Sequence, residues 1–468
     1  MFHRKNAVFT AVAGLLACSG FAMADSTQIQ APSLSLSPKT ITAQDAPQGL
    51  LMQGLDKVGA GKELSDLGIN VYGWLETGWT WNHRWRDTQD IQNQGNLVPG
   101  PFNHEWGNHV MINQFVIRAE KIVDASKGKF DVGGMIELMY GTDAARIHST
   151  GLGYNGSDST DNNDPNDPIA VANFHPIMQF DIPQAYLDIV VPVGNGLVLR
   201  VGKFVTLMGY ETIDPRTNNF YSHSYMFQAI PFTQSGFYGT YKINDKWTVK
   251  AGISKGWDVT LEEQHRDPTD PASGSLCAID AFGQVVYTHS DTLSLIVNWS
   301  TGPQNPADTS HYRTVIDPIV TWKATKDLTF AAEFIYVYDG GMNWEESGNS
   351  HAYGDEWGVA LYGTYVINDM FTLNGRLEKF HSYTDSGALG DLSENPGFAS
   401  GGDQVPNVNV YGITLGVTIT PFPKDPIGRN LIIRPEIRYD FSEDHMYQAG
   451  GNSWKDQLTM GADIIFKF

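Results

Sequence analysis

The chain has 468 residues, a net charge of −21, 48 glycines and 12% aromatic residues, and its mean hydropathy is slightly negative. Beyond the first 24 residues it contains no run of 18 or more apolar residues, which excludes a helical membrane protein. The composition fits either a soluble all-β protein or a membrane β-barrel, and the distribution of the polar residues has to decide between them.

Residues 1–24 are predicted to be a secretory signal peptide. A basic start precedes a short apolar stretch at 7–17, and the sequence AMA at 22–24 is a small-x-small cleavage site. A second interpretation is open, because LLAC resembles a lipoprotein box in which Cys18 would be lipidated. Since only Cys277 follows the signal peptide, no internal disulfide is expected.

Residues 25–68 are predicted to be a periplasmic N-terminal segment, either a short helix or a linker. From residue 69 to residue 468 the sequence predicts strands. In 457–468 every second residue is apolar, and most residues between them are small, polar or charged, which is the period-two pattern of a strand with one apolar and one wet face. Sixteen strands are predicted, at 69–81, 111–123, 130–141, 180–190, 197–207, 231–243, 247–257, 279–288, 292–300, 312–323, 328–339, 356–367, 370–383, 408–420, 431–441 and 457–468.

The connections between these strands alternate in length. Short turns such as NDK at 244–246 and ND at 368–369 alternate with long loops such as 142–178 and 384–407. Short periplasmic turns and long extracellular loops are typical of an outer-membrane barrel, and the strand lengths suit tilted strands that cross a bilayer. The sequence therefore predicts an all-β, transmembrane antiparallel β-barrel of about 16 strands over 69–468.

The charged residues of the strands predict a wet lumen. In 431–441, four charged residues alternate with apolar ones, and 111–123 and 370–383 repeat the scheme. A buried face would not accept such a row of charges, whereas a barrel with lipid outside and water inside satisfies all these strands at once. Sixteen strands leave room for an aqueous channel. The candidate lumen residues are Arg118, Glu120, Arg376, Glu378, Arg434, Glu436 and Arg438.

The loop at 208–227 is unusually rich in aromatic and hydrogen-bonding residues. One hypothesis is that it folds into the lumen and narrows the channel, and the other is that it packs on the rim or at an oligomer contact. The candidate constriction residues under the first hypothesis are Glu211, Asp214, Arg216, Asn219, Tyr221, His223 and Tyr225.

The acidity of the chain lies in its long loops, which together carry −20 of the net charge of −21. An acidic vestibule attracts cations and repels anions within about 10 Å at 0.1 M salt. The sequence therefore predicts a mild cation preference.

No motif indicates catalysis, a cofactor or a metal. Four aspartates at every third position in 158–168 could hold calcium, but they lack the order and the closing glutamate of an EF-hand, so a solvated acidic loop is the favoured interpretation. The partners expected are outer-membrane lipid and small hydrophilic solutes, with no nucleic acid, and a homo-oligomer remains open.

From about residue 69 to residue 468, the chain resembles the OmpL-like beta-barrel porin family. The residues that carry the resemblance are YGWLETGW at 72–79, the loop at 209–227, the block at 231–258 and RLEKF at 376–380. The resemblance implies a channel in the bacterial outer membrane and no catalytic residues. The sequence thus predicts a porin for passive diffusion of small hydrophilic solutes or ions, and the alternative is an outer-membrane barrel enzyme or adhesin that acts through its long loops.

Overall fold

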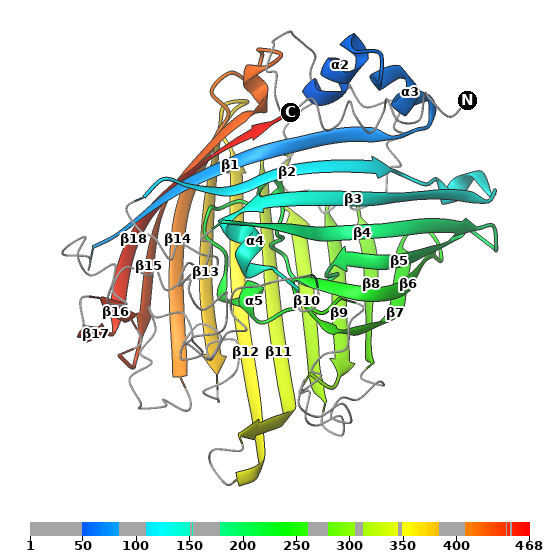
Figure 1. Ribbon diagram of the computed structural model, residues 1–468. Coiled ribbons are helices and arrows are strands. Elements are labelled where there is room, and N and C mark those ends of the chain that lie inside the picture. The colour runs from blue at the N-terminus through cyan, green and yellow to red at the C-terminus, as the bar shows by residue number, and fades with distance from the viewer. Residues whose placement is uncertain are drawn as a thin grey trace, which may run out of the picture.

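Sixteen antiparallel strands form one closed barrel, in which the first strand, β1, pairs with the last, β18 (Figure 1). The computed structural model describes residues 49–83, 109–149, 152, 178–260, 279–304, 312–344, 349–382, 408–445, 447–449 and 452–468. Closure leaves no barrel strand with an unpaired edge, which is what hydrocarbon requires because it cannot solvate backbone groups.

All sixteen predicted strands are present, and each pairs with its neighbour in the chain. The barrel strands are β1 (Asn70–Asn82), β2 (Met111–Lys121), β3 (Asp131–Gly141), β4 (Gln179–Val191), β5 (Leu197–Val205), β6 (Thr233–Lys242), β7 (Trp247–Trp257), β8 (Asp280–Ser290), β9 (Leu293–Gly302), β10 (Arg313–Lys323), β11 (Leu328–Trp344), β12 (Asn349–Val366), β13 (Phe371–Ser382), β14 (Val408–Ile419), β15 (Leu431–Ser442) and β18 (Asp456–Lys467).

Two predicted loops contain strand. The hairpin of β11 and β12 continues to Trp344 and resumes at Asn349, so most of the loop predicted at 340–355 belongs to the hairpin. The loop predicted at 442–456 holds a small separate hairpin of β16 (Tyr447–Ala449) and β17 (Asn452–Trp454). Both segments are rich in polar residues and glycine, a composition typical of loops. This composition hides the period-two pattern of a strand in their sequences.

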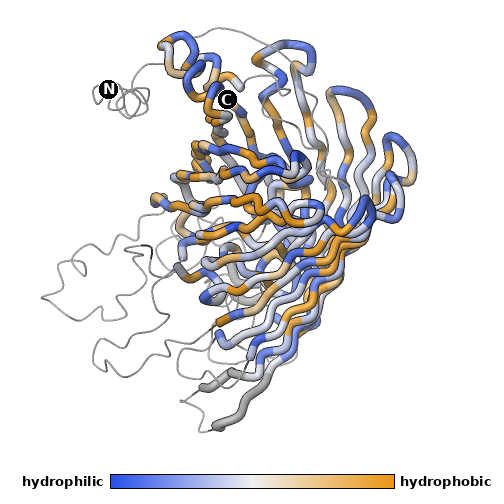
Figure 2. Tube along the Cα trace, turned by 90° about the vertical axis from the view of Figure 1, so that its right-hand side faces the viewer, coloured by the Kyte–Doolittle hydropathy of each residue, from blue (hydrophilic) through white to orange (hydrophobic). Residues whose placement is uncertain are grey.

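Buried and more exposed residues alternate along strands such as β15, and Figure 2 shows hydrophobic and hydrophilic residues following one another along the barrel strands. On β15, Ile437 and Tyr439 are 40% and 38% exposed on the outer face, while Arg438 and Asp440 are buried inside the barrel. The predicted assignment of the two faces of this strand is therefore confirmed.

Part of the segment before the barrel is helical. Helices α2 (Leu50–Lys57) and α3 (Gly61–Asp66) pack on the first two strands: Met52 and Leu55 of α2 and Leu64 of α3 form one cluster with Val71 of β1 and Ile117 of β2. Val71 and Ile117 belong to the outer face of the barrel, because their strand neighbours Tyr72 and Arg118 face the lumen. The helices thus cover the outside of the first two strands, at the end of the barrel where the short turns lie (Figure 1).

The main hydrophobic core lies inside the barrel. Residues of the segment between β5 and β6, among them Phe220, Tyr225 and Met226, pack against wall residues such as Trp74 and Phe380. The lumen is therefore partly filled, and a long loop supplies the filling.

The remaining parts of the chain lie outside the description. They include the predicted signal peptide at 1–24 with Cys18, the acidic segment 158–168 and Cys277. None of the helices in the described ranges combines the length and the apolar character needed to cross a membrane.

Candidate functional site

The connection between β5 and β6, residues 206–232, crosses the interior of the barrel, and we call it the lumen loop. It contains a short 3-10 helix, η4 (Pro215–Thr217), and a helical turn, α5 (Tyr225–Gln228). Its hydrogen bonds reach wall residues on β2, β8, β10, β11, β12, β13 and β15. The structure thus favours the first of the two hypotheses drawn from the sequence, since the loop lies inside the lumen.

Local polar residues fix the shape of the loop before any wall contact is made. Asp214 caps η4 by accepting a hydrogen bond from the backbone N–H of Arg216, and it also binds the Arg216 guanidinium through Nε and Nη2 at 2.8 and 2.6 Å. Thr212 N–H donates to the side chain of Asn218, which in turn donates to the Thr212 carbonyl. These bonds close a compact turn that presents its carbonyls and carboxylates outward to the wall.

Arg376 of β13 is the most extensively bonded link between loop and wall. Its Nη1 donates to Glu211 at 2.7 Å and to the carbonyl of Ser222 at 2.8 Å, and its Nη2 donates to the Ser222 hydroxyl and to Thr414 at 3.1 Å. Its Nε donates to Glu378 at 3.1 Å. The side chain is fully buried, so these contacts replace the water that the guanidinium would otherwise bind.

Two further arginines hold the loop through its backbone carbonyls. Arg434 of β15 donates to the carbonyls of Pro215 and Asn218 at 2.8 and 2.7 Å and pairs with Asp463 of β18. Arg438 donates to the carbonyl of His223 at 2.6 Å and pairs with wall carboxylates on β13 and β15. Each arginine is therefore neutralised by the wall and tied to the loop by its remaining donors.

Wall carboxylates bind the loop in the opposite sense, by accepting from its backbone N–H groups. Glu436 accepts from Tyr221 and Ser222 at 2.9 and 3.1 Å, and Glu378 accepts from Tyr225 at 2.8 Å. On the far wall, Asp317 of β10 accepts from Gly209 at 2.7 Å, and Glu333 of β11 accepts from Tyr210 at 3.0 Å. The loop is thus fixed to opposite sides of the barrel.

Glycines of the wall make room for the large side chains of the loop. A Cβ at Gly78 of β1 would overlap the ring of Tyr221, and a Cβ at Gly358 of β12 would overlap the sulfur of Met226. Both positions require close approach of a loop side chain to the strand backbone, which only glycine permits.

The charged groups of the loop are strongly shifted by their neighbours. Burial alone would raise the pKa of Glu211, but Arg376 and His223 outweigh burial and lower that pKa to about 2. Burial likewise acts against the charged form of Asp214, yet Arg216 and Arg118 hold the pKa of Asp214 well below its usual range. Burial lowers the pKa of His223, although Glu211 lies 3.1 Å from Nδ1 and acts against that shift, so the imidazole is neutral near pH 7.

The structure places all seven candidate constriction residues in the lumen loop, and the seven candidate wall residues on the lumen face. Arg118 binds Asp214 of the loop at 3.0 Å and also bonds Glu137 of β3. Glu120 accepts from the Tyr72 hydroxyl at 2.7 Å and has no bond to the loop among the described contacts. Asn219 donates to Thr364 of β12.

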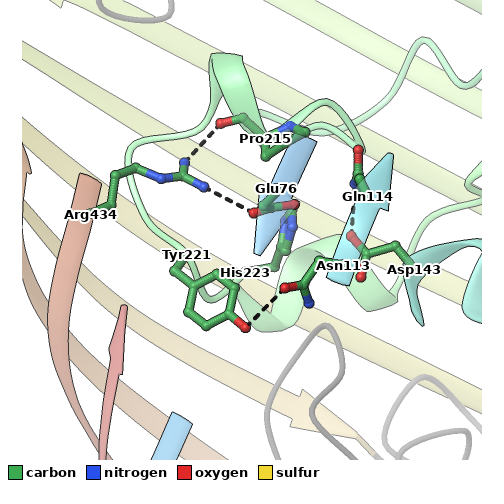
Figure 3. Close-up of a pocket in the computed structure, with 8 residues that line it drawn as sticks. All are labelled: Glu76, Asn113, Gln114, Asp143, Pro215, Tyr221, His223 and Arg434. Carbon is green, nitrogen blue, oxygen red and sulfur yellow. Dashed lines mark hydrogen bonds and ion pairs between the residues drawn. The ribbon is translucent and has the colours of Figure 1, made fainter. Parts of the chain in front are cut away.

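Sequence reasoning missed part of the site, shown in Figure 3. The segment predicted as the outer loop 142–178 begins with a helix, α4 (Thr142–Arg146), that turns into the lumen, where Asp143 accepts from Gln114 of β2 at 2.7 Å. Burial raises the pKa of Asp143 to about 7. Tyr221 points toward Asn113, with 3.5 Å between the oxygens. The residues around this pocket are Glu76, Asn113, Gln114, Asp143, Pro215, Tyr221, His223 and Arg434.

Comparison with known proteins agrees with this architecture. A family model described as "Putative beta-barrel porin-2, OmpL-like" matches residues 68–468. The chain belongs to this family. Membership in this porin family assigns the chain to the bacterial outer membrane, as the resemblance of its sequence implied.

Three solved structures resemble the chain at low sequence identity. OprB of Pseudomonas putida has a TM-score of 0.51 and 12% identity, covering 88% of this chain and 97% of that chain. The channel DcaP of Acinetobacter baumannii has a TM-score of 0.48 and 13% identity, covering 86% and 97%. An anion-selective porin from Comamonas acidovorans has a TM-score of 0.48 and 9% identity, covering 86% and 99%. No curated protein matches the chain in sequence.

Proposed function

We propose that this protein is a water-filled channel through which small hydrophilic solutes or ions diffuse passively across the outer membrane, with its short turns toward the periplasm. The observation that carries the proposal is the lumen loop, which is bound to opposite walls of a closed barrel by charged groups. A loop held in this way sets the width of the passage without needing any energy source. The residues named above as constriction candidates act by size and charge, and no catalytic step is proposed.

We also propose a mild cation preference. The chain carries a net charge of −21, nearly all of it in the long loops of the sequence. The lumen loop is one of these loops and carries Glu211 and Asp214 against Arg216, so one negative charge of this total lies inside the barrel. Fixed carboxylates raise the local cation concentration within about a Debye length. A homo-oligomer is compatible with this proposal and is not required by it.

Planar bilayer recording tests the channel proposal. The purified protein, added to a bilayer in 1 M KCl, should insert in discrete steps of constant, ohmic conductance. Under a KCl gradient, the reversal potential should have the sign that indicates preferred passage of K⁺. Protein that assembles in the bilayer and gives no conductance would contradict the channel, and a Cl⁻-selective current would contradict only the preference.

A further inference from the structure

A lysine that has no ion-pair partner among the described residues lies on the lumen face of β7. Lys250 pairs across the sheet with Thr240 of β6 and Gln284 of β8. Directly paired residues share a face of the sheet. Because Gln284 donates to the carbonyl of Leu207 in the lumen loop at 3.0 Å, Lys250 also faces the lumen, close to where the loop touches β8.

The ammonium of Lys250 is available to a solute. The Lys250 side chain is half-buried on the lumen face. Within the described residues, no carboxylate lies within the 4.0 Å of an ion pair with its ammonium. Arg376, Arg434 and Arg438, in contrast, are buried, neutralised by carboxylates and bound to the lumen loop.

Arg200 gives this part of the wall a second, well-positioned cation. Its Nε and Nη2 each donate to Asp188 of β4 at 2.8 Å, and its guanidinium carbon lies 3.6 Å from the ring centre of Tyr186. The Arg200 side chain is 24% exposed. Asp188 compensates the charge of Arg200, so Arg200, Asp188 and Lys250 together carry a net charge of +1.

Register brings the two cations to one patch of wall. Arg200 pairs with Tyr238 of β6, and Tyr238 pairs with Gly252 of β7, two residues from Lys250. Two strand spacings of about 4.8 Å and an offset of two residues, about 7 Å along the strand, separate their backbones, a distance that the two long side chains can reduce. Both residues also lie near the short-turn end, because Arg200 is the fourth residue of β5 and Lys250 the fourth of β7.

We propose that Lys250 and Arg200 form a binding site for the carboxylate of small organic acids, on the periplasmic side of the lumen loop. The inference rests on the proposed channel and names a solute class for it. In a passage dominated by carboxylates, an anion meets a barrier, and a cation without a bound carboxylate beside the lumen loop lowers that barrier locally. Cations still dominate the current, while organic acids gain a transient binding step.

Current block by succinate tests the site. Succinate added on the short-turn side should reduce the single-channel current in a saturable manner, whereas succinamide, a neutral molecule of similar size, should not. Lys250→Gln should weaken the apparent affinity for succinate about tenfold or more, since it removes one charge-assisted interaction. The control Lys246→Gln removes an exposed lysine from the turn of the same hairpin and should leave the block unchanged.

A binding measurement separates the site from the channel. Broadening of the succinate proton NMR signal by the detergent-solubilised protein reports binding whether or not the protein conducts. Broadening by the wild type and its loss in Lys250→Gln support the site. Equal broadening by the two proteins, or equal block by succinate and succinamide, overturns it. A protein that binds succinate through Lys250 but never conducts would refute the channel and leave the site standing.

Discussion

Removal of the Arg376 side chain should release the lumen loop from one wall of the barrel. Arg376→Leu deletes five hydrogen bonds, three of which go to the loop, and leaves the buried carboxylate of Glu211 without its arginine. Breaking a buried ion pair on one side costs about 3–5 kcal/mol. Because each 1.4 kcal/mol changes an equilibrium about tenfold, the ratio of docked to undocked loop should fall by about 10²- to 4 × 10³-fold.

Single-channel recording would detect this release. Arg376→Leu should give a larger mean conductance and more current noise than the wild type, because the loop spends more time away from the wall. The matched control is Arg313→Leu, which removes a lumen arginine that binds Asp339 and, among the described contacts, makes no bond to the loop. If the two variants show the same conductance and noise as the wild type, the loop is not held by these bonds and the reasoning fails.

Three further predictions concern the loop charges, the outer face and the helices. The pKa of Glu211 is about 2 in the folded protein and about 4.3 in the unfolded chain. The stabilisation by ionised Glu211 is therefore complete above about pH 4.3 and is lost as the pH falls through about 2. Channel noise should accordingly rise only below about pH 4. Ile437→Arg places a charge on the lipid face and should lower the free energy of unfolding in lipid vesicles by about 2–4 kcal/mol. Arg438→Leu should lower it by about 3–5 kcal/mol, because buried carboxylates lose their partner. If either change left the free energy of unfolding unaltered, the face assigned to that residue would be wrong. Leu55→Asp should expose 49–68 to protease while the barrel keeps its stability, whereas Val58→Asp, at a position 62% exposed, should not.

The sequence predicted the barrel because alternation is a local property. Each strand carries its own period-two pattern, and short turns fix which strands pair, so the fold needed no knowledge of distant contacts. The lumen position of Arg376 and Arg438 followed from the same pattern. The inward course of the loop could be raised as a hypothesis, since its polar and aromatic composition suits a crowded interior better than open solvent.

The partners inside the lumen could not be predicted. Arg376 meets Glu211 across 165 residues, and which wall carboxylate meets which loop group depends on barrel size and loop course, neither of which leaves a local trace. The sequence does not distinguish Gly78 and Gly358 from other strand glycines, because the side chains that pack on them, Tyr221 and Met226, belong to a distant loop. The helices on the outer face were also unpredictable in position, because their apolar residues would suit any apolar surface.

The account depends most on the claim that lipid surrounds the strands and water fills the lumen. Neighbouring residues of β7 test this claim directly, since Val249 belongs to the outer face and Lys250 to the lumen face. Val249→Cys and Lys250→Cys, each made in a Cys277→Ser background and reconstituted in lipid vesicles, would be treated with a water-soluble thiol reagent and, separately, with a bilayer-confined one. The account predicts that the water-soluble reagent labels the Lys250→Cys protein and the bilayer-confined reagent the Val249→Cys protein. The reverse pattern, or equal labelling of both by the water-soluble reagent, would contradict it.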